Sequence, residues 1–294
     1  MSLPILQETS VQATDGTRLR VQTFGRGPLP IVIANGLGGT MIAWTPLLRA
    51  FEDRARFISW DYRGLYGSER PADLRRLQVG HHVGDMRVVL DAMGVSRAVF
   101  AGWSMGVQVA VQAAADLADR SLGLLLINGT YGRVFETAFA APGSQLVLPQ
   151  VNRLARRLAP LLPHAVSMVT RQPWFLPAMA RTGLVDERLD REVFLEIARG
   201  FDKLDFDVYH RIMGHLHEHD GEPALRQISA PLLLIAGGKD AMTPPSVREV
   251  FQRHVPHAET HIVPRGTHYT LLEYPDDVIQ RVGQFLDNHI GVDG

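Results

Sequence analysis

The sequence predicts an α/β fold in which a mostly parallel, twisted sheet carries helices on both faces. Short apolar runs rich in Val, Ile and Leu end in glycine-bearing turns or polar loops, and helix-like stretches separate them. Most runs are nearly continuous in apolar residues, which is typical of strands covered on both faces. Strand–helix alternation of this kind indicates a parallel sheet with right-handed crossovers. The predicted strands cover residues 19–25, 29–36, 55–61, 97–103, 121–130, 230–238 and 259–264.

Apolar side chains at helical spacing predict the helices between these strands. Residues 81–94 place four such side chains on one face and end at Gly94, a C-terminal stop. Residues 45–53 begin with Thr45, which we expect to be the N-cap, and Pro46 then takes the first helical position. Further helices are predicted at residues 246–255 and 276–290.

The alternation stops between about residues 131 and 225. Strand-like runs are absent there, and prolines punctuate helix-like pieces until the alternation resumes near residue 230. We therefore expect a core made of residues 1–130 and 226–294. The remaining segment, 131–225, is predicted to be a helical insertion between two strands of one sheet.

The amino-acid composition limits the classes of protein to which the chain can belong. The chain has 294 residues, a formal net charge of -1 and 46% hydrophobic residues, which is typical of a soluble globular protein with a substantial core. It has no cysteine, which excludes disulfides and a thiol nucleophile and fits a reducing compartment, so we expect a cytoplasmic protein. The N-terminus lacks a secretory pattern, and no apolar run reaches the ~20 residues of a transmembrane helix. The near-zero charge argues against nucleic acid as the main partner. The oligomeric state stays open.

The clearest chemical signal is a serine between two glycines in the stretch AGWSMG. Ser104 lies between the strand predicted at 97–103 and a helix-like stretch that begins at Met105. A serine at this junction sits on a tight, strained turn where flanking side chains would collide with the strand and helix, and Gly102 and Gly106 remove that collision. The hydroxyl then projects from the carboxyl edge of the sheet, where open α/β folds bind ligands. Ser104 is the candidate nucleophile.

A serine hydroxyl needs a base, and the base needs an orienting carboxylate. His268 lies in the loop after the strand predicted at 259–264, and Asp240 lies in the loop after the strand predicted at 230–238. The chain order is therefore Ser104, Asp240, His268, each after a different strand. This order predicts a catalytic triad.

Two backbone amides should converge on the oxyanion of an acyl-transfer reaction. Met105 offers one amide, because it begins the helix after the serine. The glycine-rich loop NGLGGT after the strand predicted at 29–36 should supply the other, from Leu37. Its neighbours Asn35 and Gly36, and Trp103 beside the serine, are predicted to contact the substrate.

Other motifs predict no cofactor and no metal site. His215 and His219 are four residues apart and would share one face of a helix, but no further ligands cluster with them. Glycine-rich stretches such as GRGPLP are too short and wrongly spaced for a dinucleotide or phosphate loop.

With these residues in place, the chain resembles the α/β-hydrolase superfamily over nearly its whole length. AGWSMG resembles the nucleophile elbow, GGKDAMTP the acid loop, and GTHY the histidine loop. DYRGLYGS is similar to a loop usually written Asp-x-Arg-Gly-x-Gly-x-Ser; here Tyr66 takes the place of the second glycine, which is displaced to Gly67. A second departure is that the oxyanion loop begins Asn35-Gly36 instead of His-Gly. The resemblance implies that residues 131–225 form a cap over the active site.

The nucleophile discriminates within the superfamily. Haloalkane dehalogenases and epoxide hydrolases use an aspartate there, so Ser104 favours a serine hydrolase that cleaves carboxylic esters through an acyl-enzyme (esterase/lipase type, EC 3.1.1). Apolar residues at 167–180 are compatible with an apolar acyl chain, although such residues also pack a cap onto a core. A cofactor-free haloperoxidase or perhydrolase, a carbon–carbon bond hydrolase and a non-catalytic ligand receptor remain alternatives.

Overall fold

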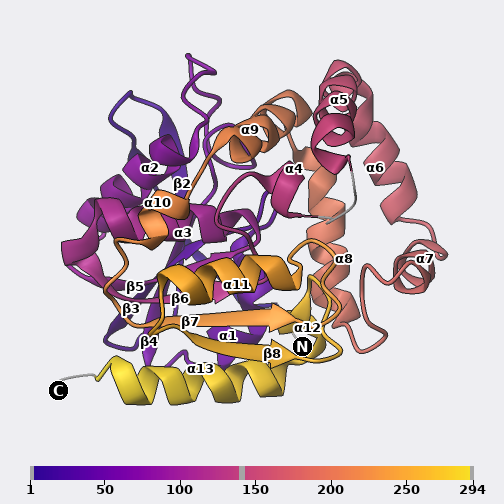
Figure 1. Cartoon of the computed structure of the whole chain (residues 1–294). Helices are drawn as coiled ribbons and strands as arrows, with labels where there is room; N and C mark the ends of the chain where they lie inside the picture. The colour runs from indigo at the N-terminus through magenta and orange to yellow at the C-terminus, as the bar shows by residue number, and fades with distance from the viewer. Residues whose placement is uncertain (1–2, 139–142, 292–294) are drawn as a thin grey trace.

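The computed structural model describes residues 3–138 and 143–291, and within them eight strands form one sheet (Figure 1). The strand order is β1-β2-β4-β3-β5-β6-β7-β8; β1 and β2 pair antiparallel, β2 pairs antiparallel with β4, and the remaining neighbours are parallel. The predicted fold class is confirmed. The strands are β1 (Gln7–Gln12), β2 (Arg18–Phe24), β3 (Leu29–Ala34), β4 (Ala55–Trp60), β5 (Ala98–Trp103), β6 (Ser121–Ile127), β7 (Leu232–Gly237) and β8 (Glu259–Val263).

Both faces of the sheet are covered, which explains the continuous apolar runs. In β3, Val32 packs into one hydrophobic cluster, with α2 (Val79–Ala92) and α3 (Met105–Asp116). Its neighbours Ile31 and Ile33 pack into a second cluster on the other face. Because successive strand side chains point to opposite faces, every position of a doubly covered strand must be apolar.

The helices on the second face and near the sheet ends complete the core. The second face carries α1 (Thr45–Ala50), α12 (Thr270–Glu273) and α13 (Pro275–His289), while α10 (Glu222–Leu225) and α11 (Pro245–His254) lie on the first. The short 3₁₀ turns are η1 (Met41–Trp44), η2 (Ala118–Arg120), η3 (Ala159–Leu161) and η4 (Phe201–Lys203). No helix in the described part of the chain is long and apolar enough to cross a bilayer.

Two local expectations were incomplete or wrong. Strand β1 was not predicted, because it is almost fully exposed and polar and joins the sheet through its backbone pairing with β2. Thr45 does not cap α1: η1 precedes the helix, the N-cap position is Trp44, and the Thr45 hydroxyl donates to the Ile42 carbonyl. Gly94 does end α2, with a left-handed φ of 66°.

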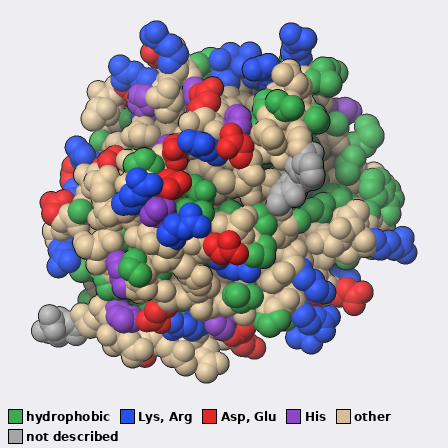
Figure 2. Space-filling view, viewed as in Figure 1, with side chains coloured by type: hydrophobic (Ala, Val, Ile, Leu, Met, Phe, Trp, Pro, Cys, Tyr) green, Lys and Arg blue, Asp and Glu red, His purple; other side chains and the backbone are tan. Residues whose placement is uncertain are grey.

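Between β6 and β7 the described residues contain helices and turns but no strand. We call residues 131–225 the helical insert. Figure 1 shows most of it at the upper right of the molecule, and Figure 2 shows hydrophobic side chains exposed along that side. Besides α10 and the turns η3 and η4, it holds α4 (Val134–Thr137), α5 (Ser144–Arg157), α6 (Leu162–Thr170), α7 (Phe175–Arg181), α8 (Arg191–Gly200) and α9 (Phe206–Glu218).

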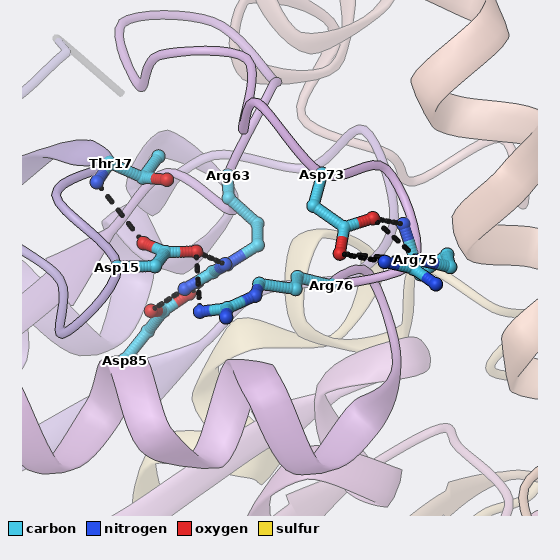
Figure 3. Close-up of polar contacts among 7 residues, drawn as sticks. All are labelled: Asp15, Thr17, Arg63, Asp73, Arg75, Arg76 and Asp85. Atoms are coloured by element: carbon cyan, nitrogen blue, oxygen red, sulfur yellow. Dashed lines mark hydrogen bonds and ion pairs between the residues drawn. The ribbon is translucent and has the colours of Figure 1, made fainter.

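A buried ion cluster anchors the loop that follows β4. The Arg63 guanidinium, with a side chain only 3% exposed, pairs with Asp85 of α2, whose side chain is 1% exposed, and with Asp15 at 2.8 Å (Figure 3). Asp15 also accepts the backbone N–H of Thr17. The cluster therefore joins the β1–β2 turn, the loop after β4 and helix α2.

Removing one member of this cluster should leave an uncompensated buried charge. We expect Asp85→Ala to lower the free energy of unfolding by ~3–5 kcal/mol, measured by urea denaturation. The matched control is Asp73→Ala, which breaks the solvent-exposed Asp73–Arg75 pair in the same view (Figure 3) and should leave stability nearly unchanged. Equal effects of the two variants would contradict this account.

Candidate active site

The parallel strands bring several chemically notable residues to one edge of the sheet. The carboxyl ends of β3, β5, β6, β7 and β8 lie together because these neighbours are parallel. The residues that follow these strands are Leu37 after β3, Ser104 after β5, Asn128 after β6, Asp240 after β7 and His268 after β8.

Ser104 occupies the strained turn expected from its glycines. Its φ of 55° and ψ of -118° are unusual for a residue with a side chain, and it stands at the N-cap position of α3. A Cβ on Gly102 would lie 2.4 Å from the Gly106 carbonyl oxygen, and one on Gly106 would lie 1.8 Å from the Ala34 carbonyl oxygen. The predicted collision is confirmed, and Gly129 adds another: its Cβ would meet the Ser104 carbonyl at 2.4 Å.

Asp240 and His268 form a buried pair. His268 Nδ1 lies 2.9 Å from Asp240 Oδ2. The same carboxylate oxygen accepts the Thr243 hydroxyl at 2.6 Å and the Asn128 amide at 2.8 Å, and the other oxygen accepts the Met242 backbone N–H at 2.8 Å. These bonds fix the plane of the carboxylate, and the carboxylate fixes the imidazole ring.

The surroundings of Asp240 keep it ionised. Burial alone would raise the pKa of its carboxyl, but the charge and hydrogen bond of His268 oppose it, as do the hydrogen bonds of Thr243 and Asn128. The net result is a pKa below the ordinary value of an aspartate. Asp240 is therefore suited to stabilise an imidazolium and unsuited to act as a proton donor.

Asn128, directly after β6, was not among the residues predicted from the sequence. Its amide donates both to Asp240 and to the Thr267 carbonyl, at 2.8 and 2.7 Å, and so joins the acid loop to the histidine loop. Its left-handed φ of 46° is one that asparagine tolerates better than most residues. An asparagine directly after a buried parallel strand was the available signal.

Trp103 links the serine turn to the histidine loop. Its indole N–H donates to the His268 carbonyl at 3.1 Å, and the two ring centroids are 5.6 Å apart. On its other side the Trp103 ring lies against Gly36, where a Cβ would stand 2.9 Å from the ring and 3.2 Å from the Ser104 Cβ. The loop after β3 therefore passes directly beside the serine.

The two backbone N–H groups predicted to stabilise an oxyanion are not engaged within the described protein. Within residues 3–138 and 143–291, neither the Leu37 N–H nor the Met105 N–H donates a hydrogen bond to another protein group. The Gly36 carbonyl, by contrast, accepts the Gly39 N–H at 2.8 Å. The turn leaves the Leu37 amide available beside Ser104.

Asn35 does not lie where a substrate contact was expected. It is 2% exposed, its Nδ2 donates to Ser59 Oγ at 2.8 Å, and its Oδ1 accepts from the Trp44 indole at 3.1 Å. Both ends of the amide are satisfied inside the protein, so the side chain holds the loop instead of facing a ligand. The inward orientation of the Asn35 side chain depends on its buried partners Ser59 and Trp44, which the fold brings to it, and so could not be inferred from the sequence.

Two tyrosines brace the same loop from behind. The Tyr62 hydroxyl donates to the Asn35 carbonyl at 2.8 Å, and the Tyr66 hydroxyl donates to the Gly38 carbonyl. Tyr66 adopts a left-handed φ of 49°, as a glycine at that position would, and so keeps the turn while adding a hydroxyl. The two bonds flank Leu37 and orient the peptide groups around it.

An apolar cavity of about 380 Å³ lies in the helical insert next to this edge. Tyr269, the neighbour of His268, belongs to its wall, as does Phe201, whose ring packs on Gly38, where a Cβ would lie 2.7 Å from it. The lining residues are Ala165, Val166, Val169, Thr170, Phe175, Met179, Phe194, Ile197, Ala198, Phe201 and Tyr269. None of them carries a charge. Among the described residues, no group of three or more His, Asp or Glu side chains is placed to hold a metal ion.

The chain matches the family described as alpha/beta hydrolase fold over residues 30–275 and therefore belongs to that family. Membership supports hydrolase activity.

Particular relatives are distant. The chain is 26% identical over 276 residues to 3-oxoadipate enol-lactonase 2 of Acinetobacter baylyi, covering 93% of this chain and 94% of the relative. It is 28% identical over 262 residues to the candidate carbamate hydrolase RutD of a Caulobacter species, covering 87% and 90%. The crystal structure of an enol-lactonase from Burkholderia xenovorans superposes with a TM-score of 0.75 at 23% identity, covering 95% of this chain and all of that one. That likeness shows the fold.

The role of Asn128 can be measured through stability. Asn128→Gly suits the left-handed backbone but removes both donated hydrogen bonds, so we expect a loss of ~1–3 kcal/mol in the free energy of unfolding at about pH 7. Because the folded-state pKa of Asp240 is depressed, its contribution is present above the unfolded pKa and disappears as the pH falls through the folded pKa. The loss should therefore be smaller at about pH 3, below the ordinary pKa of an aspartate, measured by urea denaturation. An equal loss at both pH values would argue against this coupling.

Proposed function

We propose that this protein is a serine hydrolase that cleaves carboxylic esters through an acyl-enzyme, with Ser104, His268 and Asp240 as its triad. The observation that carries the proposal is the buried His268–Asp240 pair, which follows strands at the same sheet edge as a serine held in a strained turn. Nucleophilic acyl transfer requires a hydroxyl that a substrate can reach, a base and a fixed carboxylate.

In the proposed cycle the imidazole of His268 takes the proton of the Ser104 hydroxyl as its oxygen attacks the ester carbonyl. Asp240 holds Nδ1 of the ring, so the opposite nitrogen is the one that accepts the proton, and the carboxylate stabilises the imidazolium that forms. The imidazolium then protonates the departing alcohol. Water, deprotonated by the same imidazole, attacks the acyl-enzyme and releases the acid.

Stabilisation of the tetrahedral intermediate falls to the Leu37 and Met105 amides. Neither has a competing acceptor in the described protein, and Met105 also begins α3, whose N-terminal end favours negative charge. Each such donor commonly contributes ~3–4 kcal/mol to the barrier reduction in acyl transfer. Leu37 and Met105 therefore complete the reaction centre.

The cavity in the insert supports an ester with an apolar group. Its volume lies in the range of small-molecule sites, and its wall is aliphatic and aromatic, with polar atoms only on Thr170 and Tyr269. In this arrangement the helical insert, residues 131–225, acts as a cap over the site. An enol-lactone, the substrate class named for one relative, is a cyclic ester and suits the same chemistry. The dicarboxylic acid in that name does not suit a wall without cations, so an uncharged apolar ester is the better match.

The function is tested first at the nucleophile. A fluorophosphonate should label Ser104, identified by peptide mass spectrometry, and Ser104→Ala should lose the label and at least ~10⁴-fold in turnover of p-nitrophenyl butyrate. The exposed Ser96→Ala variant is the control and should keep both. Full ester turnover in Ser104→Ala would overturn the proposal.

A substrate panel then separates the alternatives that share this triad. p-Nitrophenyl esters of rising acyl length and simple lactones report ester hydrolysis, acetate with peroxide reports perhydrolysis, and a dienoic diketone reports carbon–carbon cleavage. We expect turnover of the esters to rise with acyl length until the cavity is filled. Labelling of Ser104 without turnover of any member would point to a ligand receptor.

The tyrosine brace generates a separate prediction. Tyr66→Phe keeps the ring and the left-handed backbone but releases the Gly38 carbonyl, so the Leu37 amide loses part of its orientation. We expect kcat on p-nitrophenyl butyrate to fall about fivefold, the worth of one hydrogen bond, with KM nearly unchanged. Tyr66 acts here as a positioning residue.

The control for this variant is Tyr131→Phe. It also removes a tyrosine hydroxyl, and it keeps the ring that packs edge to face against Phe251. It should leave kcat and KM at the wild-type values. A Tyr66→Phe enzyme that changes KM alone would mean that the tyrosine serves substrate binding and not the oxyanion.

A further inference from the structure

One face of helix α5 is apolar and exposed to solvent. Val147, Val151 and Leu154 of the helix and its C-cap Leu158 follow helical spacing and are 59%, 53%, 57% and 46% exposed, and no residue of the helix is fully buried. The opposite side is attached to the protein, since the Asn152 side chain pairs with the carbonyl and ring of His210 in α9. A helix whose apolar stripe points away from its own protein is unusual. Large contiguous apolar patches on monomers commonly mark binding sites.

The exposed apolar surface continues beyond α5. Leu161, Met168, Val169 and Trp174 are also exposed on the following segment. Figure 2 shows hydrophobic side chains gathered at the right-hand side of the molecule, over α6, with basic side chains above them and below. We call the face formed by these eight residues the apolar face of the insert.

The charge of this segment has one sign. Between Glu136 and Asp186 the sequence contains no aspartate or glutamate but five arginines, in a protein whose formal net charge is -1. The five are Arg153, Arg156, Arg157, Arg171 and Arg181.

Two of these arginines lie close to the apolar stripe and carry unpaired charge, and one of them, Arg153, donates a hydrogen bond to the neutral Gln150 side chain at 3.2 Å. Arg153 and Arg157 are four residues apart on the exposed side of α5, next to the stripe, and form no ion pair among the described residues. Arg156 and Arg171 each lie 3.7 Å from an aspartate of η4 or α9. The exposed side of α5 therefore combines an apolar stripe with unpaired positive charge.

We propose that the apolar face of the insert docks on an anionic lipid surface. An amphipathic helix that lies in a bilayer interface inserts its apolar stripe and places its cations at the headgroups, and α5 has both features. A second copy of the chain is the weaker occupant, because two such faces would bring together the unpaired Arg153 and Arg157 of both copies, and like charges across an interface are repulsive.

The cavity reaches the same face. Val169 is 38% exposed within the apolar face and also lines the cavity. A hydrophobic molecule dissolved in the lipid would meet the cavity wall without crossing water. The docking itself does not depend on the proposed ester chemistry, so the two can fail separately.

The test is co-sedimentation of the full chain with vesicles. We expect binding to vesicles of phosphatidylcholine with phosphatidylglycerol, little binding to phosphatidylcholine alone, and loss of binding at high salt. The double variant Arg153→Gln, Arg157→Gln should weaken binding about fivefold for each arginine. Val151→Asp with Leu154→Asp should abolish it.

The matched control is Ile262→Asp, which places a charge on an exposed apolar residue of β8, outside the insert. It should bind as the wild type does. Thermal melting of all variants, which alter exposed side chains, checks that they remain folded. The proposal is overturned if the wild-type protein stays in solution in the presence of the anionic vesicles. It is also overturned if the wild-type protein is a dimer that binds no lipid and that Val151→Asp with Leu154→Asp converts to a monomer.

Discussion

The close approach of helix α3 to strand β3 is the constraint on which the proposed reaction centre depends. The backbone of Gly106 lies so near the Ala34 carbonyl that no Cβ fits between them, and Gly102 is similarly crowded by the first turn of α3. The chain must therefore reverse direction within a single residue after β5. Ser104 takes the strained conformation that results, and the strain is offset by the packing of α3 on the sheet. The same approach places the loop after β3 beside the serine, so one packing contact positions both the hydroxyl and an amide donor.

The histidine is held by a different means, through hydrogen bonds between loops. Asp240 orients its ring, Asn128 ties Asp240 to the Thr267 carbonyl, and Thr267 in turn bonds the buried carboxylate of Glu273. Burial raises the pKa of Glu273, and its hydrogen bonds to Thr267 oppose that shift. Glu273 also accepts the Asp186 backbone N–H, at 2.9 Å. The histidine loop is thus bonded to the helical insert, so a displacement of the insert near residue 186 would be felt at the imidazole.

The sequence predicted those features that a local pattern encodes. Continuous apolar runs identified seven strands because both faces are covered, and the glycines around Ser104 identified the turn because only their absent Cβ atoms relieve the collision. It failed where the determinant is a distant neighbour. Strand β1 is polar and depends on β2 for its pairing, and the Asn35 side chain turns inward because Ser59 and Trp44 satisfy it. Tyr66 stands where the family pattern has a glycine. The role of its hydroxyl depends on the Gly38 carbonyl, 28 residues away in the sequence, which accepts its hydrogen bond.

The helical insert has two apolar surfaces with different origins. Its inner side chains, such as Phe194 and Ile197, join the hydrophobic cluster of the core and wall the cavity, so folding alone explains them. Folding does not explain the outer stripe of α5, because exposed Val and Leu side chains gain little from the folded state and favour association. Residues 137–185 also contain no aspartate or glutamate, the side chains that would improve solubility. A surface that lowers solubility and does not stabilise the folded chain is best explained by a binding partner.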